Sequence, residues 1–244
     1  MPQNEYVSGQ RNRTGIMAKT AAKKGTSDWV AADLEQAIHE HRLPPGTKLG
    51  EDEIAEAYTT SRTTVRAALQ ALAHRRLVEL KRNRGAFVAQ PTVREAREVF
   101  EARAMLEPRT TRSATQRMTD DAFARLQAHI DAEHQALDDG DSGRALYLSG
   151  HFHIEIARIA DQSTIEAFIS ELVSRSSLII ALYWHRRAAL CESQAHHALM
   201  EAFRTRDADL AEDLMKSHLL DLVASLDLRN RTSIPASLKE ALGR

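Results

Sequence analysis

The sequence is poor in cysteine, in glycine and in long apolar runs. Its 244 residues include one cysteine, Cys191, which cannot form a disulfide within the chain and which suits a reducing cytosol. No stretch approaches the roughly 18 apolar residues of a membrane-spanning helix, and residues 1–25 lack the apolar run of a secretory signal. These absences predict a cytoplasmic protein with no membrane partner. Only ten glycines and few strand-like runs are present, which favours a mostly helical fold.

Charge is distributed unevenly along the chain, although the net charge is only −1. Residues 26–60 carry eight acidic residues against two basic ones, whereas residues 61–84 carry seven Lys/Arg against a single Glu79. A local basic surplus of this kind is typical of a surface that binds a polyanion, although a solvated helix face produces the same pattern. Residues 1–25 are also basic, but they have no apolar period and are predicted to form a flexible tail.

Residues 26–90 are predicted to form a winged helix-turn-helix domain. A first helix ends at Leu43-Pro44-Pro45-Gly46, because proline disfavours helix in the residue before it. A short helix from about Glu51 to Tyr58 and a longer helix capped by Ser61 follow, separated by a few polar residues as in a helix-turn-helix. Two β-prone runs, 77–80 and 86–88, then flank a polar tip and predict a hairpin.

The start of the helix capped by Ser61 is suited to reading DNA. Its apolar residues share one face, so Arg62, Thr63, Thr64 and Arg66 are expected to lie free of the core. A recognition helix places its N-terminal residues on base edges in the major groove, where arginine grips guanine with two hydrogen bonds. The alternative is a basic amphipathic helix beside a solvated hairpin, and the combination of cap, turn and hairpin argues against it.

Residues 28–90 resemble the GntR superfamily of bacterial regulators. Many relatives have Pro where this chain has Thr64 and Glu where it has Ala67; the first change bears on base preference and neither bears on the fold. The resemblance rests on Leu43-Pro44-Pro45-Gly46-Thr47-Lys48-Leu49, Ile54-Ala55, Ser61-Arg62-Thr63-Thr64-Val65-Arg66-Ala67-Ala68-Leu69, Leu72, Leu77-Val78 and Arg82-Asn83-Arg84-Gly85-Ala86-Phe87-Val88. It implies contacts with double-stranded DNA by Ser61, Arg62, Thr63, Thr64, Arg66, Arg82 and Asn83.

The second half of the chain is predicted to form an all-α bundle over residues 95–230. It follows a linker near Ala89-Gln90-Pro91, and Pro108 is expected to kink its first helix. Residues 231–244 are interpreted as a loose tail. The fold class is therefore mostly α, an N-terminal winged helix-turn-helix plus a C-terminal six-helix bundle. The six helical segments are expected at roughly 93–117, 119–139, 142–160, 163–185, 192–205 and 207–228.

Three histidines are predicted to point into this bundle from three different helices. Helical spacing places each of His153, His196 and His218 on the apolar face of its own segment, whereas His151 and His197 lie off these faces and are predicted to be exposed. One such histidine is most simply a hydrogen-bonded core residue. Three imidazoles in one small bundle instead predict a site for a divalent metal such as zinc or nickel.

Arg103 is a further inward polar residue, placed between Val99 and Leu106. A buried arginine needs an anion, so its guanidinium beside the histidines predicts a pocket for a small organic acid.

This half resembles the FCD ligand-binding domain of FadR-like regulators, and its six segments make it similar to the VanR-type branch. In many relatives a metal-binding Asp stands four residues before the first histidine, where this chain has Ser149, so the resemblance implies a metal site that is weak, completed by water or empty. The carrying residues are Glu101-Ala102-Arg103, Leu106-Glu107-Pro108, Phe152-His153, His196, Ala202, Asp207, Ala211, Met215 and His218-Leu219. The predicted effector pocket comprises Arg103, Ser149, His153, His196 and His218.

Three functions are consistent with these patterns. The first is a ligand-responsive transcriptional regulator, most often a repressor in this superfamily, that binds a near-palindromic operator as a homodimer and responds to a small carboxylate. The second is a metal-dependent enzyme that uses the three histidines, although no carboxylate is evidently paired with them as a general base and Glu155 is expected to face away. The third is an architectural DNA protein, for which inward-facing Arg103 and histidines would have no use.

Overall fold

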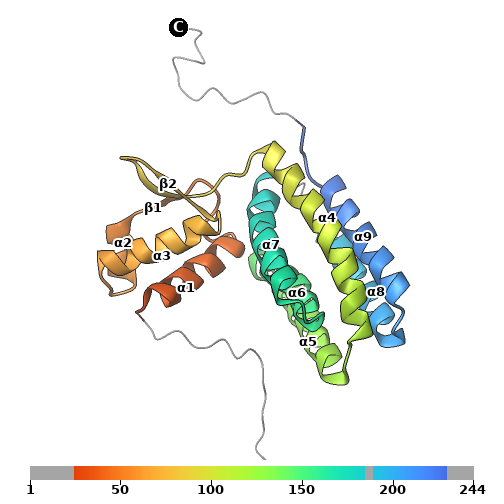
Figure 1. Ribbon diagram of the computed structural model, residues 1–244. Helices are drawn as coiled ribbons and strands as arrows, with labels where there is room; N and C mark the ends of the chain where they lie inside the picture. The colour runs from red at the N-terminus through yellow and green to blue at the C-terminus, as the bar shows by residue number, and fades with distance from the viewer. Residues whose placement is uncertain (1–24, 185–188, 230–244) are drawn as a thin grey trace, which may run out of the picture.

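The computed structural model describes residues 25–184 and 189–229, and it has two parts (Figure 1). The tails predicted for residues 1–25 and 231–244 lie outside the described residues, apart from Gly25. The described residues contain nine helices and one three-stranded sheet, which confirms the mostly α fold class. None of these helices is long and apolar enough to cross a membrane.

The N-terminal part is a winged helix-turn-helix. Its elements are α1 (Ser27–His39), β1 (Lys48–Leu49), α2 (Glu51–Ala57), α3 (Arg62–His74), β2 (Val78–Lys81) and β3 (Gly85–Val88). The strands are antiparallel in the order β1-β3-β2, with Lys48 opposite Phe87 and Val78 opposite Val88. Strand β1 was not predicted, because two residues are too few to show an alternating pattern.

The core of this part forms where α1 and α3 pack on the sheet. Val30 and Ile38 of α1 meet Leu69 and Leu72 of α3, and all four side chains are buried. The α1 helix is capped by Thr26, whose hydroxyl accepts a hydrogen bond from the backbone N–H of Trp29. This core holds α3 so that its opposite face is left to solvent.

The C-terminal part is a bundle of six helices, as predicted. They are α4 (Val93–Gln116), α5 (Asp120–Asp138), α6 (Ser142–Ile159), α7 (Ser163–Tyr183), α8 (Ala189–Thr205) and α9 (Ala208–Ala224). Helices α4 and α9 lie side by side, as do α5 and α6 (Figure 1). Pro108 lies inside α4, which continues past it to Gln116. The bundle core is built from large apolar side chains, among them Leu126, Phe152, Ile156, Phe203 and Met215.

The end of α1 joins the two parts. Ser177 of α7 donates from its hydroxyl to the carbonyl oxygen of His39 at 3.3 Å and accepts from the His41 ring at its own carbonyl oxygen at 3.0 Å. Gly143 of α6 lies so close that a Cβ there would be 2.2 Å from the carbonyl oxygen of Glu40, and only glycine avoids that clash. Leu178 of α7 is fully buried in the core of the DNA-binding part, so α1 is packed directly against the bundle.

Candidate DNA interface and candidate metal centre

The polar start of α3 projects away from the core, as the sequence pattern requires of a recognition helix. The hydroxyl of Ser61 accepts a hydrogen bond from the backbone N–H of Thr64 at 3.1 Å and thereby starts the helix. Arg62, Thr63 and Arg66 are exposed, and Thr64 is half-buried. The exposed side chains surround the positive end of the helix dipole, which itself favours phosphate.

Carboxylates of α2 pair with both arginines of this helix start, which the sequence analysis did not anticipate. Asp52 contacts Arg62, and Glu51 Oε2 lies 2.9 Å from Arg66 Nη2. The two arginine side chains remain 63% and 62% exposed, so these surface pairs contribute little free energy and can be exchanged for DNA contacts. The acidic first turn of α2 therefore lies beside the two arginines that are predicted to contact DNA.

The hairpin tip lies on the same side of the domain as α3. Asn83 has φ of 59° and Gly85 has φ of 92°, a left-handed turn that leaves Arg82 and Asn83 exposed. Arg82 and Asn83 line one groove together with Arg66 and Gln70 of α3. The structure thus brings the wing tip and α3 together, and all seven residues remain predicted DNA contacts.

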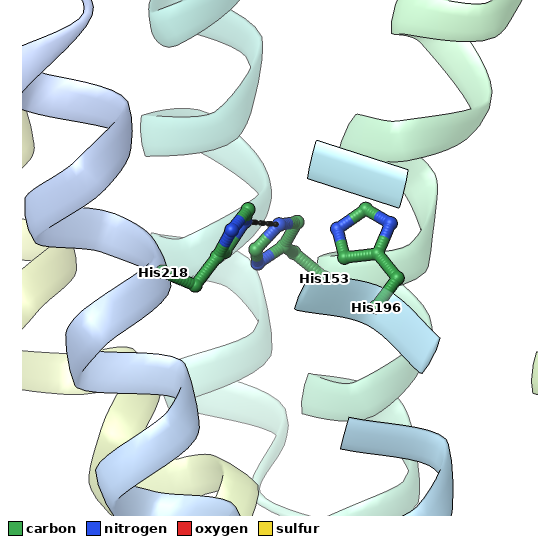
Figure 2. A group of neighbouring side chains, drawn as sticks. All are labelled: His153, His196 and His218. Atoms are coloured by element: carbon green, nitrogen blue, oxygen red, sulfur yellow. Dashed lines mark hydrogen bonds between the residues drawn. The ribbon is translucent and has the colours of Figure 1, made fainter. Parts of the chain in front are cut away.

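The three predicted histidines converge inside the bundle (Figure 2). His153 of α6, His196 of α8 and His218 of α9 are 4%, 0% and 4% exposed. One ring nitrogen of each lies within 4.8 Å of the others, and the Nε2 atoms of His153 and His218 are 3.2 Å apart. Two nitrogens that bind one zinc tetrahedrally at about 2.0–2.1 Å lie roughly 3.3–3.4 Å from each other. The His153 and His218 Nε2 atoms, which form a hydrogen bond with each other, are therefore at a separation close to that of a shared metal (Figure 2).

Two buried glutamates hold two of these rings from behind. The Nδ1 of His153 donates to Glu107 Oε2 at 2.7 Å, and the Nδ1 of His196 donates to Glu133 Oε2 at 3.2 Å. Because a carboxylate oxygen accepts the proton on Nδ1, each neutral ring keeps its lone pair on Nε2. Metal-binding histidines are commonly oriented by carboxylates in this way. The sequence indicated no carboxylate paired with the site as a general base, and these two glutamates lie behind the rings as orienting partners.

The centre also passes a direct test for a missing ligand. His196 Nε2 is buried and has no hydrogen-bond partner among the described residues, and a buried polar atom rarely stays unpaired. Burial lowers the pKa of His218 well below its usual value, with the neighbouring His196 and His153 acting in the same direction. Burial lowers the pKa of His153 too, although Glu107 opposes that shift. An imidazole nitrogen without a proton is a ligand that a divalent cation such as zinc accepts.

The anion that pairs with Arg103 is Glu107 of the same helix. The Nε and Nη2 atoms of Arg103 donate to the two carboxylate oxygens of Glu107, the second at 3.2 Å, and both side chains are 3% exposed. Burial would raise the pKa of Glu107, but the charges of Arg103 and His153 outweigh it and lower that pKa to about 2. The buried arginine was predicted to need an anion, but Glu107 fills that need, and only Nη1 is not used by this pair.

A cavity adjoins the histidine centre and holds about 550 Å³ of unfilled space, including its open mouth. Four of the five predicted effector residues line it, namely Arg103, Ser149, His153 and His218, whereas His196 does not. His151 lines it too and is half-buried, so its predicted exposure was wrong. Its place off the apolar stripe of α6 was correct, but a second domain covers that side of the helix. His197 is exposed, as predicted.

The site residues that the sequence analysis missed carried readable signals. Glu133 follows Leu126 and Ile130 on the buried face of α5, so helical spacing alone marks it as inward. Glu107 stands four residues after Arg103, the spacing at which opposite charges meet on a helix. Glu155, expected to face away from the histidines, pairs with Arg125 and Arg158 instead.

Comparison with known proteins agrees with this architecture. The HTH-type transcriptional repressor NanR of Salmonella newport (strain SL254) is 27% identical over 240 residues, which cover 86% of this chain and 88% of the relative. A GntR transcriptional regulator from Rhodococcus sp. RHA1 superposes with a TM-score of 0.72 at 26% identity, over 81% of this chain and 95% of that chain. E. coli McbR/YncC has the same fold, with a TM-score of 0.73 at 20% identity and the same coverage.

Two family models match the two parts of the chain. Residues 26–88 match the bacterial regulatory proteins of the gntR family, and residues 98–221, about half of the chain, match the FCD domain. FCD domains in this family often bind metal ions, in keeping with the three histidines brought together here. The family consists of DNA-binding regulators rather than enzymes, so the enzyme alternative is set aside. The chain is a GntR-family transcriptional regulator with a winged helix-turn-helix domain for DNA and an FCD domain for a small-molecule effector.

Proposed function

We propose that this regulator is a cytoplasmic repressor that releases its operator when a small carboxylate binds the FCD domain. The observation that carries the proposal is the pairing of an exposed basic reading face on α3 with a buried histidine centre beside an open cavity. The similarity to the NanR repressors over most of the chain supports repression rather than activation.

A homodimer on a near-palindromic operator fits the DNA-binding domain. One recognition helix reads only one half-site, and specific binding normally needs two half-sites about one helical turn apart. Selecting operators from random duplexes with the full-length protein should therefore yield an inverted repeat, and sedimentation of the complex should give two chains per duplex. A single half-site with one bound chain would contradict the dimer.

The metal would be held by His153, His196 and His218, and it would supply positive charge for the effector's carboxylate. Ser149 adds no charge where many relatives have an acid, so the protein ligands are neutral and an anionic effector completes the site. Arg103 Nη1, which is not used by Glu107, is a second donor for that carboxylate. Metal and acid should therefore bind cooperatively, each raising the affinity for the other by the same factor.

The test combines elemental analysis with a thermal-shift screen of small carboxylates, run with and without added divalent metals. We expect stoichiometric metal in the wild-type protein and larger acid-dependent shifts when metal is present. His196→Ala should remove both effects. The matched control is His197→Ala, because His197 is the neighbouring histidine of α8 and is exposed. Unchanged melting with every metal, together with no bound metal, would reduce the centre to a polar pocket anchored by Arg103.

A further inference from the structure

The cavity beside the histidine centre is walled on one side by the DNA-binding domain. Its lining follows α6 from Leu146 to Ile154, roughly 12 Å of helix at 1.5 Å per residue. His153 and His218 line it from the bundle, whereas His39 lines it from the last turn of α1. A ligand that fills this cavity therefore touches both domains.

His39 is a buried polar residue without a hydrogen-bond partner for one ring nitrogen. The residue lies in the seam, which is the contact of α1 with α6 and α7, and it is 7% exposed. No described residue accepts a hydrogen bond from its Nε2 or donates one to it. The oxygen of Glu35 that faces it is 4.0 Å away, too far for a hydrogen bond. His39 lines the cavity, so a ligand or an ordered water there lies beside a ring that has an unpaired nitrogen.

The ring of His39 is suited to an uncharged partner. Burial lowers its pKa to about 3, and the nearby His151, Arg75 and His41 act in the same direction. The imidazole is therefore neutral at physiological pH and can form a hydrogen bond with a hydroxyl or a carbonyl group. A second carboxylate would find no positive charge on this ring.

The rest of the lining includes both aromatic and apolar side chains. Tyr147 stacks on His151 at 3.9 Å between ring centres, next to His39 at the seam. The apolar side chains that line the cavity are Leu146, Ile154, Val173, Ile180 and Leu222. A matching ligand has a polar group for the histidine centre, a short apolar chain and a second polar group for the seam.

We propose that the seam is a second effector subsite, in which His39 hydrogen-bonds to a hydroxyl or carbonyl group at the far end of the acid. This inference rests on the proposed function, which places the acid's carboxylate at the histidine centre. It assigns the effector to the short-chain hydroxy or oxo acids. It also makes His39 a specificity-determining residue that belongs to the DNA-binding domain, so recognition of the far end bears directly on how α1 sits against α6 and α7.

The test compares matched acids on the full-length, metal-loaded protein by calorimetry. The probes are straight-chain acids of roughly four to six carbons and their terminal hydroxy counterparts, such as pentanoate and 5-hydroxypentanoate, lengths that fit along the lining helix. In the wild-type protein the hydroxy acid should bind about 2- to 12-fold more tightly, the effect of one neutral hydrogen bond. His39→Phe and His39→Leu should abolish this preference while the plain acid still binds.

Three controls separate the subsite from general damage. Each variant is first shown to bind the selected operator with wild-type affinity in the absence of acid. His74→Ala removes an exposed histidine of the same domain and should keep the full preference. His39→Gln keeps a hydrogen-bonding nitrogen and should keep part of it.

The outcomes distinguish this inference from the proposed function. If both apolar His39 variants keep the wild-type preference, or if the wild-type protein binds plain and hydroxy acids equally, the subsite is refuted while the carboxylate site stands. If no acid of either kind binds the metal-loaded wild-type protein, the carboxylate part of the proposed function fails and the subsite fails with it.

Discussion

Replacing Glu107 with glutamine should damage the stability of the FCD domain and the metal site together. The carboxylate of Glu107 is 2% exposed and is shared between Arg103 and His153. Removing one partner of a buried ion pair costs about 3–5 kcal/mol, because the other charge is left buried and uncompensated. For a chain of this size each kcal/mol corresponds to roughly 2–4 °C, so the melting temperature should fall by about 6–20 °C.

The effect of Glu107→Gln on metal binding has a separate cause. The carboxylate holds the proton on His153 Nδ1 and so keeps the Nε2 lone pair directed at the centre. Loss of such an orienting partner typically lowers metal affinity by about 10- to 100-fold. Thermal unfolding of the metal-free protein and competition with a chelator of known affinity measure the two effects independently.

Glu155→Gln is the matched control for this experiment. Glu155 is a buried glutamate on α6, 4% exposed, but it pairs with Arg125 and Arg158 rather than with a histidine. It should lower the melting temperature and leave metal affinity unchanged. The double replacement Arg103→Met with Glu107→Leu should recover much of the lost stability, because it removes both buried charges, but not the metal affinity. If Glu107→Gln melts within about 2 °C of wild type and binds metal equally well, the reasoning is refuted.

Three further predictions concern the DNA-binding domain and its seam. Arg62→Ala or Arg66→Ala should weaken operator binding about 5- to 150-fold, because each removes one bidentate contact with a base. Wild-type affinity of both variants in a gel-shift titration would overturn the assignment of these residues as DNA contacts. The pKa of His39 is lowered to about 3 in the folded state, so the unfolded chain takes up its proton first as pH falls below about 6.5, and stability is lost on acidification. Between pH 7.5 and 5, wild type should therefore lose about 2 kcal/mol more than His39→Gln in denaturant titrations, and parallel curves would contradict this. Gly143→Ala should force α6 away from the Glu40 carbonyl oxygen, so the effector should change operator affinity less than in wild type, while affinity without effector persists. An unaltered effector response in gel shifts would show that the seam tolerates the shift.

Helix boundaries and inward faces were predictable because they depend on local sequence. Thr119 and Asp207 cap α5 and α9, and such caps can be read from the sequence because a side-chain oxygen three residues before a free N–H is a local arrangement. The inward direction of His153 and His218 follows from a period of 3.6 residues on single helices. The direction of these side chains could thus be predicted from a single helix, without any contact between helices.

Contacts between distant segments were not predictable in the same way. Glu133 meets His196 across 63 residues, and periodicity shows only that each faces inward, not that they meet. His151 lies off the apolar stripe of α6 and is half-buried because α1 of the other domain covers it. The pairing of Asp52 with Arg62 depends on how α2 crosses α3, which the turn between them determines. Each of these facts belongs to the tertiary arrangement and not to any single segment.

The attachment of α1 to the bundle has a consequence for how such regulators diversify. Three residues make the contacts that join α1 to the bundle: the Ser177 hydroxyl, the His41 ring and Gly143, whose missing side chain leaves room for the Glu40 carbonyl oxygen. Side chains that line the cavity without taking part in these contacts can therefore be exchanged over generations while the two domains stay joined. The same property makes the chain a suitable starting point for biosensors, because libraries at Leu146, Ile154 and Val173 alter the wall facing a ligand and leave the contacts between α1 and the bundle in place.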